Sequence, residues 1–404
     1  MAPEDQLSDK RSAVRLVVFS DDWGRHPSSC QHLIGRLLDR YPTLWVNTIG
    51  TRAPKISWED VGKVSAKLRK WFTRSADDET LPAHLGVVNP LMVPGFRRRW
   101  HRRLNARLIS KAVNTALGPR AGGETRIAVT TVPITADLVG RLDVDRWIYY
   151  CVDDFSVWPG LDGDVLDVMD GELVRRVDAV ICVSDTLQGR VAEMGRPSHL
   201  LTHGIDLDHW QVANPAGDDL SARLPHGWSQ WSKPILLFWG VVDRRLDSDW
   251  CRALAQRCGT LVLAGPLQSP DPKLATMKRL VMPGPLPYAD LPALARAADV
   301  LVMPYADLPV TRAIQPLKFK EYLATGKPTV VRKLPATTPW QDAADVVDDL
   351  EQFVQLVTTR AASGTPQSQR KARARLIEES WEIKSTCFEQ ILLGRIDTPL
   401  KVAM

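Results

Sequence analysis

A lysine and a glutamate three residues apart stand in the stretch with the clearest chemical signal, residues 315–331. Pro316 can open a helix at its first turn, and Gly326 can end that helix before an apolar strand. The helix N-terminus would present free N–H groups to a phosphate, and Lys318 would add a full charge. Glu321 shares that helix face and could accept hydrogen bonds from two sugar hydroxyls. The same spacing also fits a solvated Lys–Glu pair.

A second candidate is the carboxylate pair Asp153 and Asp154, which directly follows the apolar run 147–152. A carboxylate that projects from a strand end could deprotonate a hydroxyl group, and we expect one of the two to be a catalytic base. A capping or loop-bracing aspartate is the alternative. Short acidic pairs also resemble Mg²⁺ ligands, but pairs this short arise often by chance, so we expect no metal site.

The segment 97–111 holds seven Lys and Arg residues and no acidic residue. Trp100 and three further apolar residues recur there at helical spacing. A basic amphipathic helix with an interfacial tryptophan suits a surface of anionic lipids, and the docking candidates are Arg98, Trp100, Arg102 and Arg103. A solvated helix face is an equal alternative, and nucleic acid is the weakest one, because no aromatic RNA-binding motif accompanies the charges.

Buried-strand patterns that could position these residues recur along the chain. Runs of three to six mainly apolar residues occur at 16–19, 44–46, 127–130, 147–152, 179–183, 235–239, 260–264 and 300–303. Most are separated by enough residues for a helix. Continuous apolar strands that alternate with helices predict an α/β fold with parallel sheets covered on both faces.

The sequence predicts that the chain divides in two near residues 211–234, where Pro, Gly, Asp and Ser interrupt every periodic pattern. We expect a first domain over 1–212, a second over 213–380, and a terminal helix over 381–404 that packs back toward the first domain. One long helix is predicted over about 367–393. Two doubly wound halves would place their strand-end loops around a cleft between them.

Composition limits the class of protein. The chain has 404 residues with 44% apolar and 25% charged side chains, as in ordinary globular proteins. Its six cysteines form no CxxC pair and predict reduced core thiols of a cytoplasmic protein. We expect neither a secretion signal nor a transmembrane helix.

Residues 316–328 read Pro-Leu-Lys-x-x-Glu-Tyr-Leu-Ala-x-Gly-Lys-Pro, which resembles the donor-binding signature of GT-B glycosyltransferases in family 4 and its close relatives. Further stretches resemble these enzymes in the same order: 147–158, 174–209, 235–247, 260–266, 282–294 and 291–305. The resemblance spans nearly all of residues 14–393, and it is weaker over 51–125.

This resemblance implies GT-B architecture, with two Rossmann-like doubly wound domains that face each other across a cleft and a C-terminal helix that crosses back. The second domain would bind a nucleotide-sugar donor, without a metal or another cofactor, through Gly240, Arg244, Arg245, Gly265, Leu286, Pro316, Leu317, Lys318 and Glu321. Arg245 is a closer match than Arg244 to the cation that stabilises the leaving diphosphate. In the first domain, the acceptor-binding candidates are Gly24, Arg25 and His26.

The sequence also departs from the family pattern. Many family 4 enzymes carry two glutamates eight positions apart, but this chain has Ala313 at the first position and Glu321 at the second. In the family, a glycine-rich segment usually precedes this helix, whereas residues 311–315 of this chain contain no glycine. Because that loop normally faces the transferred sugar, the change leaves the identity of the donor sugar open.

We therefore expect a metal-independent glycosyltransferase that acts on a lipid-linked or polysaccharide-precursor acceptor. It would be cytoplasmic and able to bind peripherally to the inner face of the cell membrane. Its partners would be the nucleotide-sugar donor, a glycan or lipid-linked acceptor and an anionic membrane surface. The alternatives are a nucleotide-sugar epimerase or hydrolase of the same fold, or a non-catalytic membrane-docking scaffold.

Overall fold

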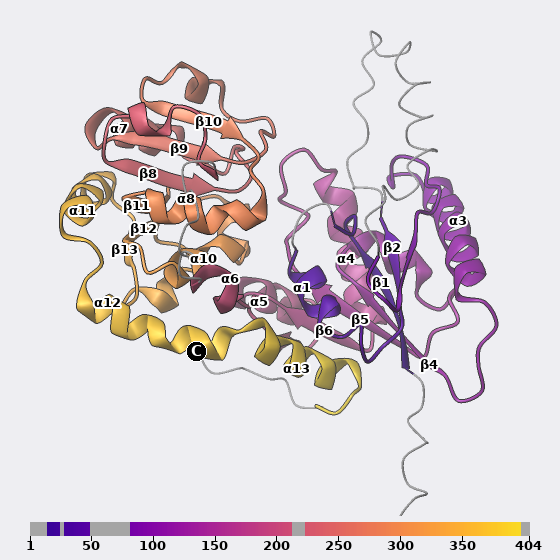
Figure 1. Ribbon diagram of the computed structural model, residues 1–404. Helices are drawn as coiled ribbons and strands as arrows, with labels where there is room; N and C mark the ends of the chain where they lie inside the picture. The colour runs from indigo at the N-terminus through magenta and orange to yellow at the C-terminus, as the bar shows by residue number, and fades with distance from the viewer. Residues whose placement is uncertain (1–13, 25–27, 49–80, 212–222, 397–404) are drawn as a thin grey trace, which may run out of the picture.

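Two parallel sheets organise the chain. The computed structural model describes residues 14–24, 28–48, 81–211 and 223–396 (Figure 1). The first sheet has seven strands in the order β3-β2-β1-β4-β5-β6-β7, and the second has six in the order β10-β9-β8-β11-β12-β13. Every pairing between neighbouring strands is parallel. Each sheet has its own buried apolar core.

The first half contains the elements coloured indigo to magenta in Figure 1. Its strands are β1 (Val14–Ser20), β2 (Thr43–Asn47), β3 (Leu85–Val88), β4 (Thr125–Thr130), β5 (Arg146–Cys151), β6 (Ala179–Cys182) and β7 (His199–Leu200). Its helices are α1 (Ser29–Gly35), α3 (Arg99–Leu117), α4 (Gly163–Arg176), α5 (Asp185–Glu193), α6 (Leu207–Gln211) and the 3₁₀ helix η2 (Pro133–Leu138).

The second half follows the same strand-then-helix order. Its strands are β8 (Ile235–Trp239), β9 (Thr260–Ala264), β10 (Leu280–Gly284), β11 (Val300–Met303), β12 (Thr329–Arg332) and β13 (Asp345–Val347). Its α-helices are α7 (Ser248–Arg257), α8 (Leu291–Ala297), α9 (Pro309–Ala313), α10 (Leu317–Ala324) and α11 (Leu350–Ser363). Short 3₁₀ helices complete it: η4 (Trp228–Gln230), η5 (Pro272–Thr276), η6 (Tyr288–Asp290) and η7 (Thr338–Trp340).

All eight apolar runs named above as strands form strands, and so does the apolar strand expected after Gly326, which is β12, but the other four strands have no clear sequence signal. Strand β7 has two residues and β13 has three, which is too short for a periodic pattern. Strand β10 contains Pro283 and Gly284, two residues that normally argue against a strand, and β3 contains Gly86. Such strands form because their neighbours pair with them.

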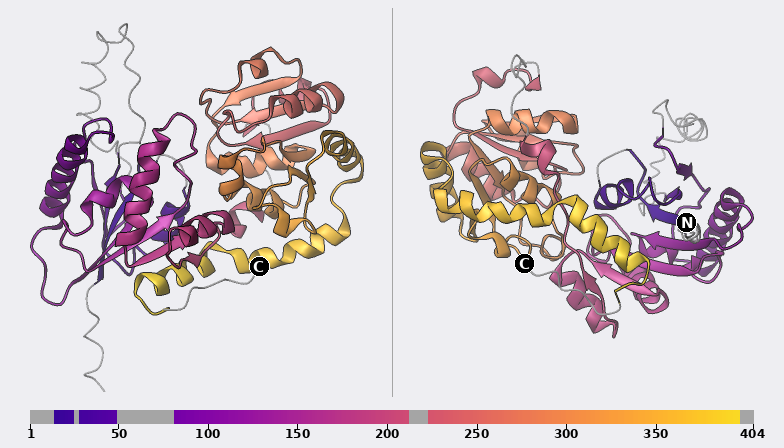
Figure 2. Two further views of the ribbon diagram at one scale, coloured as in Figure 1. Left: turned by 180° about the vertical axis from the view of Figure 1, so that it is seen from behind. Right: turned by 60° about the horizontal axis from the view of Figure 1, so that its bottom comes forward.

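The C-terminal segment is not the single long helix that the sequence predicts. It divides into α12 (Gln367–Ala372), the 3₁₀ helix η8 (Arg373–Glu379) and α13 (Trp381–Leu392). Ser380 separates the last two, because its extended backbone ends η8 and its hydroxyl accepts the Ile383 N–H as the N-cap of α13. The bend redirects α13 toward the first half (Figure 2).

The chain crosses between the halves twice, and the two crossings lie side by side. The Ile205 N–H donates to the Glu379 carbonyl at 2.9 Å, and the Trp381 N–H donates to the Ile205 carbonyl at 3.1 Å. Trp381 and Phe388 of α13 are buried in the core of the first half, whereas Leu376 of η8 belongs to the core of the second. The terminal helix therefore crosses back as expected. The expected domain boundary at residue 212 lies outside the described residues.

Candidate active site

An open cavity of about 520 Å³ lies between the two halves. The first half lines it with Ser20, Asp21, Ser28, Ser29, Cys30, Thr48, Thr131, Val132, Val152, Asp153, Phe155, Trp158 and His203. The second half lines it with Gly240, Val241, Arg245, Tyr305, Ile314, Gln315, Pro316, Leu317 and Lys318. Many of these residues follow the carboxyl ends of β1, β4, β5, β8 and β11, so the cavity lies where facing open α/β sheets bind ligands.

Lys318, in the first turn of α10, is one of two cations in the wall that the second half contributes to the cavity. Its ammonium donates to the Tyr305 phenol oxygen at 2.8 Å and lies 4.2 Å from the centre of the Phe238 ring. Among the described residues, no carboxylate is within ion-pair distance of this ammonium. A Cβ atom on Gly240, whose φ is +125°, would lie 2.2 Å from Nζ of Lys318. Glycine is therefore required where the chain turns after β8.

Arg245 brings a second cation to the same wall. It is 9% exposed, and its guanidinium pairs with Asp243, with 2.9 Å between Nη2 and Oδ2. Trp158, from the opposite half, lies with its ring centre 5.0 Å from Cζ of Arg245. The neighbouring Arg244 is exposed and does not line the cavity. Of the two arginines, the structure thus brings Arg245 to the cavity.

Glu321 lies one turn beyond Lys318 and is not among the residues that line the cavity. Its carboxylate accepts hydrogen bonds from Nε1 of Trp239 at 2.8 Å and from the Tyr288 hydroxyl at 3.5 Å. Burial raises the pKa of Glu321 to about 7, against the opposing effects of the Trp239 hydrogen bond and the Lys318 charge. Trp239 and Tyr288 therefore hold the carboxyl group in place, and no sequence pattern marked either residue for this role.

Some of the other predicted donor-binding residues line the cavity, and others lie outside its lining. Pro316 and Leu317 line the cavity at the start of α10, whereas Gly265 and Leu286 do not. A Cβ atom on Gly265 would lie 2.0 Å from the carbonyl oxygen of Gly240. Gly265 therefore allows the backbones after β8 and β9 to approach closely, and it acts on the site through Gly240.

The two adjacent aspartates have different environments. Asp153 lines the cavity, and burial raises its pKa to about 7 although the nearby Arg245 charge lowers it. Asp154 instead pairs with Arg190 at 3.2 Å and accepts a hydrogen bond from the Ser156 hydroxyl. Arg190 also pairs with Asp170 of α4. Asp154 therefore braces the loop, and Asp153 is the member of the pair that faces the cavity.

The loop after β1 contributes residues other than the predicted ones. Gly24 does not line the cavity, and its N–H donates to the Gln31 side chain at 3.4 Å. Arg25 and His26 lie outside the described residues. Asp21 and Ser28 of the same loop do line the cavity. Neither of these two residues is among the acceptor-binding candidates that the sequence suggested.

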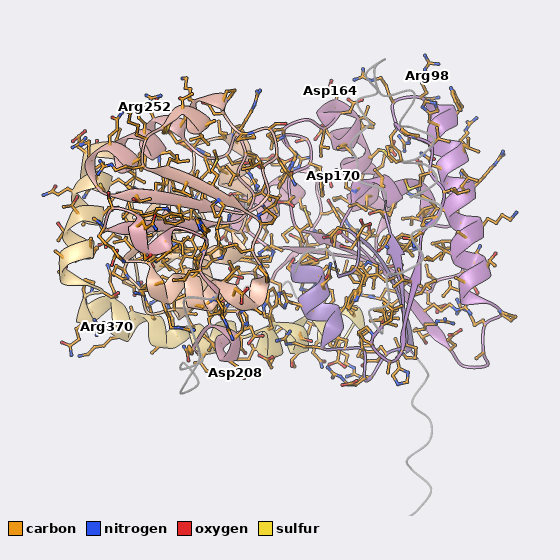
Figure 3. The ribbon with its side chains drawn as sticks, turned by 45° about the horizontal axis from the view of Figure 1, so that its top comes forward. Arg98, Asp164, Asp170, Asp208, Arg252 and Arg370 are labelled. Carbon is orange, nitrogen blue, oxygen red and sulfur yellow. The ribbon has the colours of Figure 1, made fainter. Side chains whose placement is uncertain are left out.

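The predicted basic helix is α3, and its residues face in two directions. Arg98 and Arg103 are exposed, and Trp100 is 54% exposed (Figure 3 shows Arg98 at the outer edge of the first half). Arg102, by contrast, pairs with Asp137 at 2.7 Å and with Glu172. The prediction that Arg102 faces a membrane is corrected, because these inward ion pairs occupy its guanidinium.

Ala313 occupies the place where many family 4 enzymes carry a glutamate. It is buried against the core of the first half, and its carbonyl accepts the Ser184 hydroxyl at 2.7 Å. The Thr186 hydroxyl donates to the neighbouring Arg312 carbonyl. A glutamate at residue 313 would bring a charged side chain into this buried contact, so the alanine fits a loop that is attached to helix α5 of the other half.

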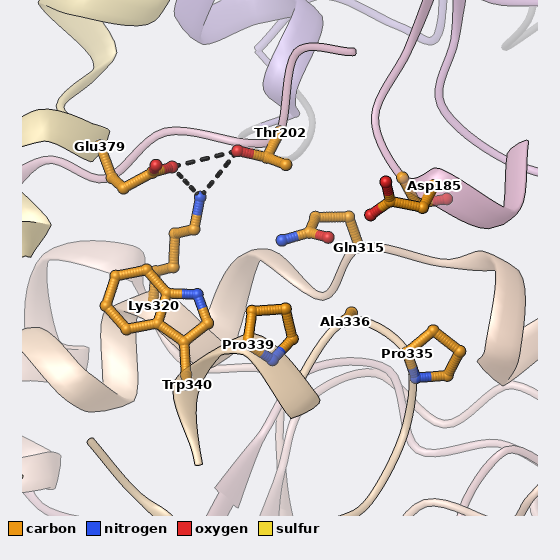
Figure 4. A pocket seen from close by; sticks show the side chains of 10 residues that line it. Asp185, Thr202, Gln315, Lys320, Pro335, Ala336, Pro339, Trp340 and Glu379 are labelled. Atoms are coloured by element: carbon orange, nitrogen blue, oxygen red, sulfur yellow. Dashed lines mark hydrogen bonds and ion pairs between the residues drawn. The ribbon is translucent and has the colours of Figure 1, made fainter. Parts of the chain in front are cut away.

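A polar cluster lies where the chain crosses between the two halves, and it holds helix α10 in place (Figure 4). Lys320 is 2% exposed and donates to Glu379 and to the Thr202 hydroxyl. Lys384 of α13 also pairs with Glu379, at 2.8 Å. This cluster therefore joins the helix that carries Lys318 to both crossing segments. It borders a small separate cavity of about 30 Å³.

Further observations bear on metal and membrane chemistry. Within the described ranges, no group of three His, Cys, Asp or Glu residues is placed to hold a metal ion. All six cysteines are free thiols, four of them buried. None of the helices in the described part of the chain combines the length and the apolar character that crossing a membrane requires.

No protein-family profile matches the chain. A curated relative, the "Putative teichuronic acid biosynthesis glycosyltransferase TuaH" of Bacillus subtilis, is 28% identical over 359 residues, which cover 83% of this chain and 84% of the relative. That name describes the relative as a glycosyltransferase, which is also the class of enzyme that the sequence resemblance implies for this chain.

Solved structures share the fold over nearly the whole chain. HepE of Anabaena, in complex with UDP and glucose, aligns with a TM-score of 0.65 and 15% identity over 94% of this chain and 99% of that one. A trehalose 6-phosphate synthase of Burkholderia multivorans aligns with a TM-score of 0.61 and 14% identity over 95% and 97%. The predicted GT-B architecture is confirmed. Membership of family 4 in particular stays a prediction.

Proposed function

We propose that this chain is a glycosyltransferase that moves a sugar from a nucleotide-diphosphate donor to a hydroxyl group of a glycan or lipid-linked acceptor. The observation that carries the proposal is the arrangement of the interdomain cavity. Arg245, Lys318 and the start of α10 lie on one wall, and Asp153 lies on the other. The two cations and the start of α10 are suitable for binding a diphosphate. The carboxylate is suitable for interacting with an attacking hydroxyl group.

On the donor side, the reaction breaks the bond between the anomeric carbon and the oxygen of the terminal phosphate. The electron pair stays with the nucleoside diphosphate, whose growing negative charge Arg245 and Lys318 would stabilise. The free N–H groups in the first turn of α10 would add to this effect. Two side-chain cations and a helix N-terminus support a reaction that does not depend on a divalent metal.

HepE of Anabaena has been solved with UDP and with UDP-glucose. An E. coli protein of similar fold has been solved with UDP-2-fluoro glucose. Because this chain shares their fold, a uridine diphosphate sugar is the first donor to test. Glu321 is our candidate for the ribose hydroxyls, held in position by Trp239 and Tyr288.

On the acceptor side, Asp153 is our candidate for the group that takes the proton of the attacking hydroxyl. Its pKa of about 7 means that a substantial fraction of the carboxyl group is ionised at neutral pH. An inverting transferase needs such a base, whereas in a retaining enzyme Asp153 would position the hydroxyl. The anomeric configuration of the product, read by NMR, distinguishes these two roles.

The outer face of α3 is our candidate for membrane docking. Arg103, Arg107 and Lys111 are exposed on it together with Trp100, and Leu104 lies between them with 36% exposure. This pattern suits the interface of an anionic bilayer and would bring a lipid-linked acceptor to the first half. Reversal of Arg98 and Arg103 to Glu should release the protein from anionic vesicles, and unchanged co-sedimentation would contradict docking.

Product analysis tests the proposed function. The chain is incubated with UDP-glucose and other nucleotide sugars, in EDTA, with and without lipid-linked and polysaccharide-precursor acceptors. Donor consumption that requires an acceptor and yields a glycosylated product supports the transferase. Consumption at the full rate with donor alone would indicate a nucleotide-sugar hydrolase or epimerase instead.

A further inference from the structure

Two aromatic side chains hold the ammonium group of Lys318. Its Nζ donates to the phenol oxygen of Tyr305 at 2.8 Å and lies 4.2 Å from the ring centre of Phe238. The ring centre of Tyr305 is 5.2 Å from the same atom. A phenol oxygen and the face of an aromatic ring attract a cation but carry no charge of their own. These contacts therefore fix the position of the ammonium without neutralising it.

Arg245, the second cation of this wall, has a different kind of anchor. Its guanidinium pairs with the Asp243 carboxylate, with 2.9 Å between Nη2 and Oδ2. A guanidinium is planar with a fixed arrangement of donors, whereas a lysine ammonium is a compact charge on a flexible four-carbon stem. An ammonium without an anchor would lose more conformational freedom when it binds a phosphate. Lys318 therefore depends on its aromatic neighbours for a defined position.

Tyr305 is itself held firmly. It is 1% exposed, and its ring meets that of Phe238 edge-on, with 5.9 Å between the centres. Its backbone forms an antiparallel bridge with Leu246, and the following N–H, of Ala306, donates to the Arg245 carbonyl at 2.7 Å. The segment that carries the phenol is thus attached to the segment that carries Arg245, so Tyr305 holds Lys318 at a set position relative to the other cation.

We propose that Tyr305 is a positioning residue for the donor diphosphate, because its phenol oxygen holds the Lys318 ammonium where the diphosphate binds. This inference rests on the proposed function, since it requires that Lys318 bind the diphosphate. Tyr305 borders the cavity but is almost fully buried, so it acts through Lys318. A cation that is already in place needs no reorganisation when its ligand arrives, which increases affinity.

Calorimetric titration of the full chain with UDP, in EDTA, tests the proposal. Tyr305→Phe removes the phenol oxygen and keeps the ring, and we expect it to weaken UDP binding at least fivefold. Tyr149→Phe is the matched control. It removes another fully buried hydroxyl, which donates to Asp170 at 2.6 Å and does not line the cavity, so UDP should bind as to the wild type. Equal UDP affinities of Tyr305→Phe and the wild type would overturn the proposal.

Double variants distinguish positioning of Lys318 from general damage to the fold. In a chain that carries Lys318→Ala, Tyr305→Phe should change UDP affinity less than twofold, because the ammonium that it positions is gone. In a chain that carries Arg245→Ala, Tyr305→Phe should still weaken UDP binding at least threefold. Similar losses in the wild-type and Lys318→Ala backgrounds would show that Tyr305 supports the structure in general, which would overturn the proposal.

A second variant tests the other part of the anchor. Phe238→Leu keeps an apolar side chain in the core but removes the ring beside the ammonium, and it should weaken UDP binding at least twofold, again only when Lys318 is present. An unchanged affinity would contradict the aromatic anchor. Thermal unfolding of each variant shows that it is folded before its affinity is interpreted.

The same titrations separate this inference from the proposed function. If the wild-type chain binds no nucleoside diphosphate, the proposed function is wrong. If the wild type binds UDP and Lys318→Ala weakens it at least tenfold while Tyr305→Phe does not weaken it, the donor site stands and the role of Tyr305 is wrong.

Discussion

Trp158 of the first half and Arg245 of the second half meet across the cavity, with 5.0 Å between the indole ring centre and Cζ of the guanidinium. This cation–π contact joins the wall that would bind the acceptor to a cation that would bind the donor diphosphate. Asp243 holds the same guanidinium from within the second half, whereas Trp158 and the Asp153 charge are contributed by the first half.

Trp158→Ala should therefore impair turnover more than donor binding. A cation–π contact contributes about 0.5–2 kcal/mol, so we expect kcat to fall by about 2- to 30-fold while Kd for the nucleoside diphosphate changes less. Trp158→Phe should retain most activity. Trp100→Ala, which removes an exposed tryptophan of α3, is the control with a water-soluble acceptor. A loss confined to nucleotide affinity would argue against this role of the contact between the halves.

Gly240→Ala should weaken donor binding by displacing Lys318. The added methyl group would lie 2.2 Å from Nζ, so the ammonium must move away from the cavity. We expect a loss of about tenfold or more in nucleoside diphosphate affinity, measured by calorimetry. Gly284→Ala controls for backbone strain, because Gly284 also has a positive φ but nothing lies within 4 Å of an added Cβ. Similar losses in both variants would contradict the explanation.

The rate of transfer should rise with pH through about 7 and then level. Asp153 must be ionised to accept a proton, and burial raises its pKa to about 7. Asp153→Asn should lower kcat by about 10²–10⁴-fold and remove this rise. Asp164→Asn, at an exposed residue of α4, should leave the profile unchanged. If the pH profile of Asp153→Asn keeps the wild-type shape, Asp153 is not the base.

Glu379→Gln should destabilise the fold, because it leaves the ammonium groups of Lys320 and Lys384 buried without a carboxylate. Breaking a buried ion pair typically costs about 3–5 kcal/mol. The two lysines lower the pKa of Glu379 to about 2 against the effect of burial. Its stabilisation is therefore present above the unfolded-state pKa and is lost as the pH falls toward 2.

Denaturant unfolding at neutral pH and in acid measures this effect. Glu378→Gln, at the exposed neighbouring residue, is the matched control and should change the free energy of unfolding by less than about 0.5 kcal/mol. Equal stability of the Glu379 and Glu378 variants would show that the cluster at the crossing does not stabilise the fold.

Much of the fold and part of the site follow from the sequence. The apolar runs placed Asp153 at the end of β5, and Pro316 and Gly326 bracket α10 closely, so Lys318 falls in its first turn. These features depend on residues near one another in the chain, where periodicity and turn chemistry are informative.

Features that depend on distant residues could not be predicted in this way. Nothing near Asp154 indicates that Arg190 pairs with it, and nothing near Arg102 indicates Asp137 and Glu172. The bend at Ser380 likewise reflects the pairing of the crossing segment with Ile205. His203 has no local pattern that marks it, and its position in the cavity is a consequence of how the halves meet.

The most direct test of the account is calorimetric titration of nucleoside diphosphates, starting with UDP, in EDTA. We predict that at least one binds the wild-type chain without a divalent metal, and that Lys318→Ala and Arg245→Ala each weaken it at least tenfold. Arg252→Ala, at a partly exposed arginine of α7 that pairs with Asp249 (Figure 3), should not. Failure of every nucleoside diphosphate to bind, or equal affinities in all three variants, would contradict a donor site in this cavity.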